Sequence, residues 1–235
     1  MQKNTIISVL IMASALFGAT NEEIIANFKA RIQIPNIQVK VVARKKVSKT
    51  LDFVTIFLTN GKSSQKVSVF TSGEYIYPEV IDVKSGINLK DKMKRESTNK
   101  NIAKIYKNEI SDNIIKLGND PRKKTLVIFS DPECPFCKRE LASIEDQLKH
   151  NNIKMIFTPV HERSSLAKSF LIYKYAKKAK NDKEKIKILR KYFSQDVDEK
   201  VSDEDVKRIE KLRTKYFQAG INGTPYKVME EDITR

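Results

Sequence analysis

The chain of 235 residues contains two cysteines, Cys134 and Cys137, and both lie in the segment "FSDPECPFCKRE". Apolar side chains follow at the spacing of one helical face: Cys137, Leu141, Ile144 and Leu148. This spacing predicts a helix from about Cys134 to His150, and Pro135 suits its first turn because a proline there loses no needed hydrogen bond. We therefore expect an exposed sulfur on Cys134 at the helix N-terminus and a shielded sulfur on Cys137.

This placement suits thiol–disulfide exchange. Free N–H groups and the dipole at a helix N-terminus favour a negative charge on Cys134, and the thiolate is the form of cysteine that attacks disulfides. Cys137 would then attack the sulfur of Cys134 and release the product. The neighbouring Glu133 should oppose the thiolate, whereas Lys138 should favour it.

Three other interpretations of the cysteine pair explain less. A structural disulfide across so short a loop gives little entropic stabilisation. A structural zinc site needs four ligands, but the chain has only two cysteines and two histidines, and neither histidine has ligand spacing. Two inert buried cysteines would leave their position at a helix start unexplained. We therefore favour a redox pair, with no metal and no cofactor.

The elements around the pair predict a βαβ unit. Leu126–Phe129 is a continuous apolar run typical of a strand buried on both faces, and "NIKMIFTPV" (152–160) predicts a second strand after the helix. Three helical segments follow and begin at Ser164, Asp182 and Ser202. The last strand is expected in "INGTPYKVM", with Thr224-Pro225 at its entry. His161, which follows the second strand, is interpreted as a surface or loop residue.

The N-terminal part has a different pattern. Thr20 and Glu23 have the spacing of a capping box, which predicts a helix to about Ala30. Four strand-like segments at 37–43, 51–61, 66–73 and 74–83 then predict an antiparallel meander with a turn at Asn60-Gly61. The charged stretch that follows carries an isoleucine stripe and is interpreted as a linker helix that continues to about Leu117.

The first residues are typical of a secretory signal peptide. Lys3 precedes the apolar run Ile6–Phe17, and small residues follow it. The run is short for a membrane span, so an uncleaved anchor is the weaker alternative. We expect the mature chain to work outside the cytoplasm, where disulfides can form.

The net charge of +16 raises the question of an anionic partner. Lysines alternate with Glu and Asp in segments such as "KAKNDKEKIKILRKYF", and no dense arginine block or nucleic-acid motif is present. A solvated basic surface therefore explains the charge better than a nucleic-acid site.

The motifs "CPFC" and "GTP", together with "FTPVHERSSLAKSFLIYKYAK", resemble the DsbC/DsbG-like periplasmic thiol:disulfide interchange proteins of the thioredoxin superfamily. The resemblance implies a mixed α+β and α/β architecture. Its expected parts are a signal peptide (1–19), a small α+β, cystatin-like dimerisation module (20–88), a linker helix (89–119) and a thioredoxin-like catalytic domain (120–235) with a helical insertion at about 164–219.

The resemblance also implies an activity and partners. It implies a periplasmic homodimer, paired through the N-terminal module, that acts as a disulfide isomerase or reductase on misfolded or disulfide-containing secreted proteins and is kept reduced by a DsbD-like membrane electron donor. By this similarity Cys134 is the nucleophile and Cys137 is the resolving cysteine. Pro135 and Phe136 form the active-site loop, and Thr224 and Pro225 form a cis-proline loop that binds substrate.

One feature departs from this pattern. Only ten residues follow Pro225, whereas a thioredoxin domain continues with a further strand and a helix. Without that helix, one sheet face near the active site would be open to water. Either the domain is truncated at its C-terminal end, or the partner subunit or another element covers this face. Two other functions stay open. One is a disulfide oxidase with a DsbA-like role, which would use the same residues, and the other is a periplasmic chaperone or binding protein in which the cysteines are secondary.

Overall fold

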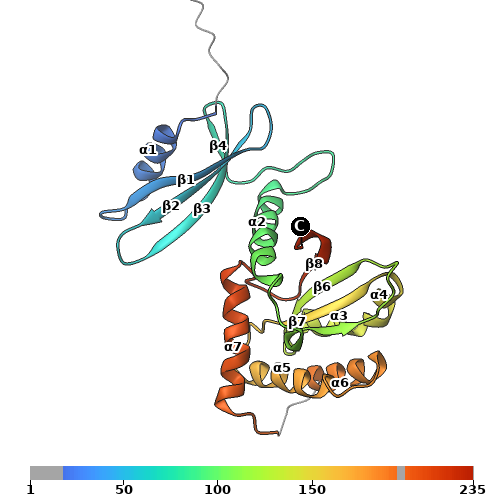
Figure 1. The fold of residues 1–235 in the computed structure, drawn as a ribbon. Helices are drawn as coiled ribbons and strands as arrows, with labels where there is room; N and C mark the ends of the chain where they lie inside the picture. The colour runs from blue at the N-terminus through green and yellow to red at the C-terminus, as the bar shows by residue number, and fades with distance from the viewer. Residues whose placement is uncertain (1–17, 195–198, 235) are drawn as a thin grey trace, which may run out of the picture. The chain divides into compact units, whose positions relative to one another are not determined.

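The computed structural model describes residues 18–194 and 199–234, and the chain divides into two compact units between Lys94 and Arg95 (Figure 1). Residues 1–17, which hold most of the expected signal peptide, lie outside the described residues. No helix in the described ranges has the length and apolarity needed to cross a membrane.

The first unit packs one helix, α1 (Asn21–Arg31), against a four-stranded antiparallel sheet (Figure 1). Its strands lie in chain order: β1 (Gln38–Lys46), β2 (Asp52–Thr59), β3 (Ser64–Ser72) and β4 (Tyr75–Tyr77). Every second residue of β2, namely Val54, Ile56 and Leu58, is buried with Ile24 of α1. The predicted meander and the capping box of Thr20 are confirmed.

Helix α2 (Leu89–Tyr106) is shorter than the predicted linker helix. A 3₁₀ turn, η1 (Ser111–Asn113), follows it, and Ile115–Leu117 form strand β5 rather than helix. The helical prediction for this last segment was wrong because β5 pairs with the distant strand β7. Its burial alternates, with Ile115 and Leu117 inside and Lys116 outside, which is the period of a strand.

The second unit contains a four-stranded sheet in the order β5-β7-β6-β8. Strands β6 (Thr125–Ser130) and β7 (Asn152–Phe157) are parallel, and β8 (Tyr226–Met229) is antiparallel to β6. The predicted βαβ unit is confirmed, but its helix breaks at Ser143 into α3 (Pro135–Ala142) and α4 (Ile144–His150). The hydroxyl of Ser143 donates to the Glu140 carbonyl at 3.2 Å, a local bond that competes with continuous helix.

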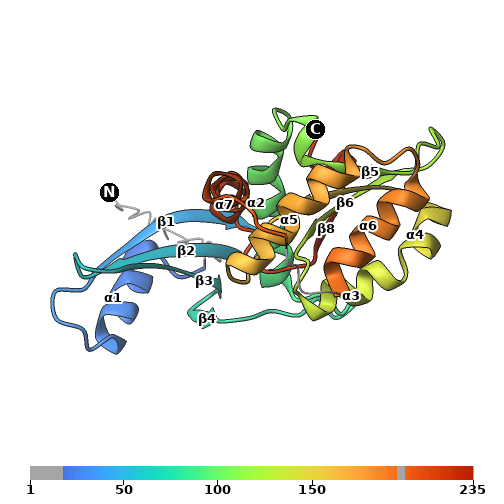
Figure 2. The same cartoon turned by 90° about the horizontal axis from the view of Figure 1, so that it is seen from below.

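Among the described residues between β7 and β8, the chain forms three helices: α5 (Arg163–Ala176), α6 (Asp182–Ser194) and α7 (Asp203–Gln218). Figure 2 shows α5 and α6 side by side, and α7 packs against α5. Helix α7 begins at an N-cap, Ser202, whose hydroxyl accepts from the Asp205 N–H, and it stops before Gly220, where φ is +109°. A short 3₁₀ turn, η2 (Glu230–Asp232), follows β8.

Strand β6 lies inside the second unit. Val127, Ile128 and Phe129 are all fully buried, so both faces of the strand are covered. Of the alternatives for this sheet face, cover by another element therefore applies to this strand. Helix α2 supplies part of the cover, because Ile102 and Tyr106 join the core. On β8, the hydroxyl of Tyr226 donates to Asn99 Oδ1 of the same helix at 2.6 Å.

Candidate active site

The cysteine pair lies where β6 leads into α3. Strand β6 ends at Ser130, and Cys134 is the N-cap residue of α3, in extended backbone conformation with Pro135 at the first helical position. The N–H of Lys138 donates to the Cys134 carbonyl at 3.0 Å and closes the first helical turn. Cys137 faces inward with Leu141 and Ile144, as the helical spacing predicted.

The loop before β8 covers the sulfur of Cys134. Thr224 and Pro225 are joined by a cis peptide bond, and the Cys134 Sγ donates to the Thr224 carbonyl at 3.2 Å. The predicted exposure of Cys134 was wrong, because only 4% of the residue is accessible to solvent. The cover comes from a segment ninety residues away in the chain. The structure thus brings together the two motifs that the sequence singled out.

Both cysteines are free thiols, and Cys137 is the more deeply buried, at 1% exposure. Burial raises the pKa of the Cys137 thiol to about 11, although the Ser130 hydroxyl and the Asp131 N–H favour its thiolate. A negative charge on the neighbouring Cys134 raises this pKa further. Cys137 is therefore a protonated, shielded thiol at neutral pH.

The residues between the cysteines are exposed. Pro135 lies at the surface, and Phe136 has 61% of its surface accessible. The guanidinium group of Arg139 lies 4.6 Å from the centre of the Phe136 ring and restrains it from one side. The site therefore presents an apolar residue next to a covered sulfur.

A buried carboxylate, which the sequence interpretation missed, supports the loop. Asp131 is fully buried and accepts five hydrogen bonds. They come from the Ser165 hydroxyl, the Nδ1 of His161 at 2.7 Å, and the N–H groups of Glu133, Val160 and His161. Burial alone would raise the pKa of Asp131, but these bonds outweigh it and hold the pKa below its usual range.

Two sequence signals could have found this network. Asp131 directly follows β6, and His161 lies shortly after β7. These strands are parallel neighbours, so their carboxyl ends meet at one edge of the sheet. His161 is exposed, as predicted for a loop residue, but it also binds the buried Asp131.

Glu133 is tied to helix α5. Its carboxylate pairs with the Nζ of Lys168 at 2.9 Å and accepts from the Ser164 hydroxyl at 3.0 Å. The Lys168 side chain is only 8% exposed. The negative charge that was expected to oppose a thiolate on Cys134 is therefore compensated by a neighbouring cation.

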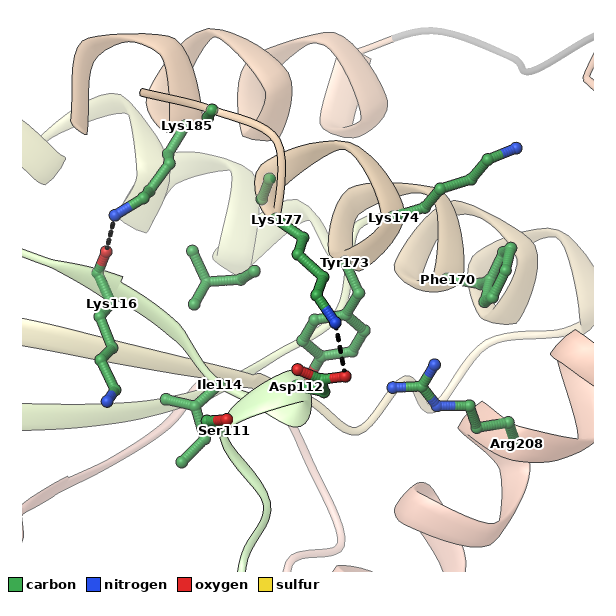
Figure 3. A pocket seen from close by; sticks show the side chains of 13 residues that line it. Ser111, Asp112, Ile114, Lys116, Phe170, Tyr173, Lys174, Lys177, Lys185 and Arg208 are labelled. Carbon is green, nitrogen blue, oxygen red and sulfur yellow. Dashed lines mark hydrogen bonds and ion pairs between the residues drawn. The ribbon is translucent and has the colours of Figure 1, made fainter. Parts of the chain in front are cut away.

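Another cavity of the second unit lies away from the cysteine pair. It has a volume of about 480 Å³ and is lined by residues of η1, β5, α5 and α7, several of them basic (Figure 3). Lys177 pairs with Asp112 at 2.9 Å, and Lys185 donates to the Lys116 carbonyl at 2.8 Å. Neither cysteine lines this cavity. Within the described ranges, no three potential metal ligands from His, Cys, Asp and Glu gather in one place.

Three solved structures illustrate what this chain is similar to. Helicobacter pylori DsbG is 22% identical with a TM-score of 0.51, over 88% of this chain and 99% of its own. A linker-deletion mutant of Proteus mirabilis ScsC is 21% identical with a TM-score of 0.44, over 60% of this chain and 75% of its own. Wolbachia pipientis alpha-DsbA2 is 21% identical with a TM-score of 0.40, over 57% of this chain and 86% of its own.

At this identity the DsbG match concerns the fold, which is similar across most of the chain. No curated protein matches the sequence. A family model described as a thioredoxin-like domain matches residues 112–232, which is more than half of the chain and includes both cysteines and the Thr224-Pro225 loop. The protein therefore belongs to the thioredoxin-like domain family.

Proposed function

We propose that the protein catalyses thiol–disulfide exchange on extracytoplasmic proteins and acts as a disulfide isomerase or reductase. The observation that carries the proposal is the 3.2 Å contact between the Cys134 Sγ and the Thr224 carbonyl. It places a thiol at a helix N-terminus against backbone groups of an extended loop. A substrate strand that pairs with this loop would bring its own disulfide to the same sulfur.

The reaction starts with the Cys134 thiolate. It attacks one sulfur of a substrate disulfide, and a mixed disulfide forms while the other substrate sulfur leaves as a thiolate. Cys137 then loses its proton and attacks the Cys134 sulfur. The mixed disulfide breaks, the substrate leaves as a thiolate, and the pair is left as a disulfide. Two electrons pass from the cysteine pair to the substrate.

The state of Cys137 favours isomerisation over simple reduction. Burial raises its pKa, so at neutral pH little of it is present as the attacking thiolate. The mixed disulfide on Cys134 therefore persists longer. During that time the free substrate thiolate can attack another disulfide bond of the substrate. A substrate thiolate can also attack the mixed disulfide, which forms a substrate disulfide and releases the reduced enzyme without net transfer of electrons.

The remaining roles and partners follow as proposals. Pro135 and Phe136 contact the substrate, while Thr224 and Pro225 bind its backbone. The first unit pairs two copies into a homodimer, and a DsbD-like membrane donor returns the pair to its dithiol form in the periplasm. These proposals follow from the resemblance of the two motifs to the DsbC/DsbG-like proteins, and the fold is similar to that of Helicobacter pylori DsbG over 88% of the chain.

The test is the reactivation of a scrambled, disulfide-rich protein by the reduced enzyme. Cys134→Ala should abolish reactivation. Cys137→Ala should retain part of the reactivation, because substrate thiolates can still resolve the mixed disulfide. It should also accumulate mixed disulfides, because Cys137 can no longer attack the Cys134 sulfur and release the substrate in reduced form. Undiminished reactivation by Cys134→Ala would refute the proposal.

The redox state in cells separates this function from that of an oxidase. Rapid alkylation of thiols in cells that express the protein should find the pair mostly reduced. A mostly oxidised pair would instead assign it the role of a disulfide donor. Sedimentation equilibrium of the mature chain tests the homodimer, and a monomer at micromolar concentration would contradict that part.

A further inference from the structure

An open groove of about 410 Å³, here called the Phe217 groove, lies in the second unit between the loop after β7 and the end of α7. Its lining includes Thr158 and Val160 from the loop after β7, Phe217 from the last turn of α7, and Ile221 and Asn222 from the segment that leads to Thr224. All of these residues belong to the second unit. Neither the thiol chemistry nor the Thr224-Pro225 loop requires this groove.

Both sides of the groove are connected to the redox site. On one side, the Thr158 N–H donates to the Ser130 carbonyl at 3.0 Å, and the Val160 N–H donates to the Asp131 carboxylate at 2.8 Å. On the other side, Asn222 stands two residues before Thr224, whose carbonyl contacts Cys134. The groove is therefore bordered by the two segments that flank the redox site.

Exposed apolar side chains gather at this place. In the described part of the second unit, four large apolar residues are exposed: Ile110, Phe136, Val160 and Phe217. Val160 and Phe217 line the groove, and Phe136 lies between the cysteines. Apolar surface of this kind, concentrated beside a reactive group, is typical of a binding surface.

The groove also holds a polar group without a partner. Thr158 is 3% exposed, and its hydroxyl has no hydrogen-bond partner among the residues that the structure describes. A buried hydroxyl is normally satisfied, so an unsatisfied one at a binding surface indicates a missing partner. The N–H and C=O groups of an extended peptide supply such a partner.

We propose that the Phe217 groove is a substrate subsite that takes an aromatic or large aliphatic side chain near the reacting cysteine of an unfolded polypeptide. Phe217 and Val160 contact that side chain, and the Thr158 hydroxyl bonds the adjacent backbone. The inference rests on the proposed function, because the peptide is held while its cysteine forms a mixed disulfide with Cys134 and its former partner leaves as a thiolate. The enzyme thereby selects cysteines that belong in a protein core.

The test uses peptide disulfides that carry either Phe or Ser at one of the positions within three residues of the cysteine. The second-order rate constant for reaction with the reduced full-length protein is measured for each peptide. The wild type should prefer Phe by about tenfold at one position, the discrimination expected of an apolar pocket. In Phe217→Ser this ratio should fall to about twofold. The ratio is diagnostic, since a general loss of activity lowers both rates.

Ile110→Ser is the matched control, because Ile110 is 57% exposed and Phe217 is 56% exposed, but only Phe217 lines the groove. It should keep the tenfold preference. Thr158→Val keeps the shape of the side chain and removes the hydroxyl. Thr158→Val should lower the rate constants for both peptides about fivefold, measured relative to the rate constant for 2-hydroxyethyl disulfide.

The outcomes separate the two proposals. A wild type that reacts with 2-hydroxyethyl disulfide but does not distinguish the peptides would overturn the groove alone. A preference that survives in Phe217→Ser would also overturn it. A wild type that reacts with no disulfide would overturn the proposed function, and the subsite with it.

Discussion

Replacement of Asp131 by alanine should destabilise the second unit strongly. The carboxylate is fully buried and accepts five hydrogen bonds, three of them from backbone N–H groups. The alanine variant leaves these three groups and the Ser165 hydroxyl without an acceptor. At about 1 kcal/mol for each stranded donor, the loss is about 4 kcal/mol, a large part of the stability of an ordinary domain. His161 is exposed and can turn to water, so it adds little.

Hydrogen exchange measured by mass spectrometry can detect this loss in the full-length reduced protein. Peptides from β6 report on opening of the second unit without interference from the first. A loss of about 4 kcal/mol should raise their exchange rate by roughly 10³-fold, since each 1.4 kcal/mol is a factor of ten. Asp146→Asn is the control, because Asp146 is an exposed residue that pairs with Lys149 at 2.6 Å, and it should leave β6 unchanged.

The pH dependence gives a second check. The pKa of Asp131 is lowered in the folded state, so its contribution to stability is present above the ordinary carboxyl pKa of about 4. It is lost as the pH falls through the lowered pKa. Asp131→Asn should remove this part of the acid sensitivity in urea unfolding. An exchange rate for Asp131→Ala within tenfold of the wild type would refute the role assigned to the carboxylate.

Three further experiments test other parts of the chain. Iodoacetamide should label Cys137 far more slowly than the other cysteine at pH 7, because its pKa is raised, and peptide mapping that finds equal labelling would contradict this. Gly220→Ala should lower the free energy of unfolding, measured with urea, by about 2 kcal/mol. At this position φ is +109°, and the added methyl group would come within 2.8 Å of a neighbouring hydroxyl oxygen. Gly86→Ala should lower the free energy of unfolding by about half as much, because Gly86 has a positive φ but open space around it. Equal losses in the two variants would exclude a contribution from the close contact at Gly220. Lys168→Met should destabilise by about 2 kcal/mol because it leaves Glu133 unpaired, and the double variant with Glu133→Gln should recover most of the loss.

Local signals predicted the regular elements well. The apolar run Leu126–Phe129 identified β6, and the capping box of Thr20 identified the start of α1. Strand β5 could not be found in this way. Its three residues continue an isoleucine spacing that also suits a helix, and pairing with the distant β7 decides the conformation. The break at Ser143 was missed for a similar reason, because the apolar spacing continues across it.

The site shows the same division between local and distant causes. Helical spacing was enough to predict that Cys137 is buried. It could not predict that Cys134 is covered, because the covering carbonyl belongs to Thr224, ninety residues later. The bond between Asp131 and His161 joins two loops that only the parallel pairing of β6 and β7 brings together.

The cover over Cys134 also bears on chemical damage. Peroxide converts accessible thiolates to sulfenic acid and then, irreversibly, to sulfinic acid. A residue with 4% of its surface open to water meets such small oxidants rarely. Under the proposed function, a bound polypeptide would instead displace the Thr224 carbonyl from the sulfur as it docks. The same loop that admits a disulfide would thus protect the idle enzyme from permanent inactivation.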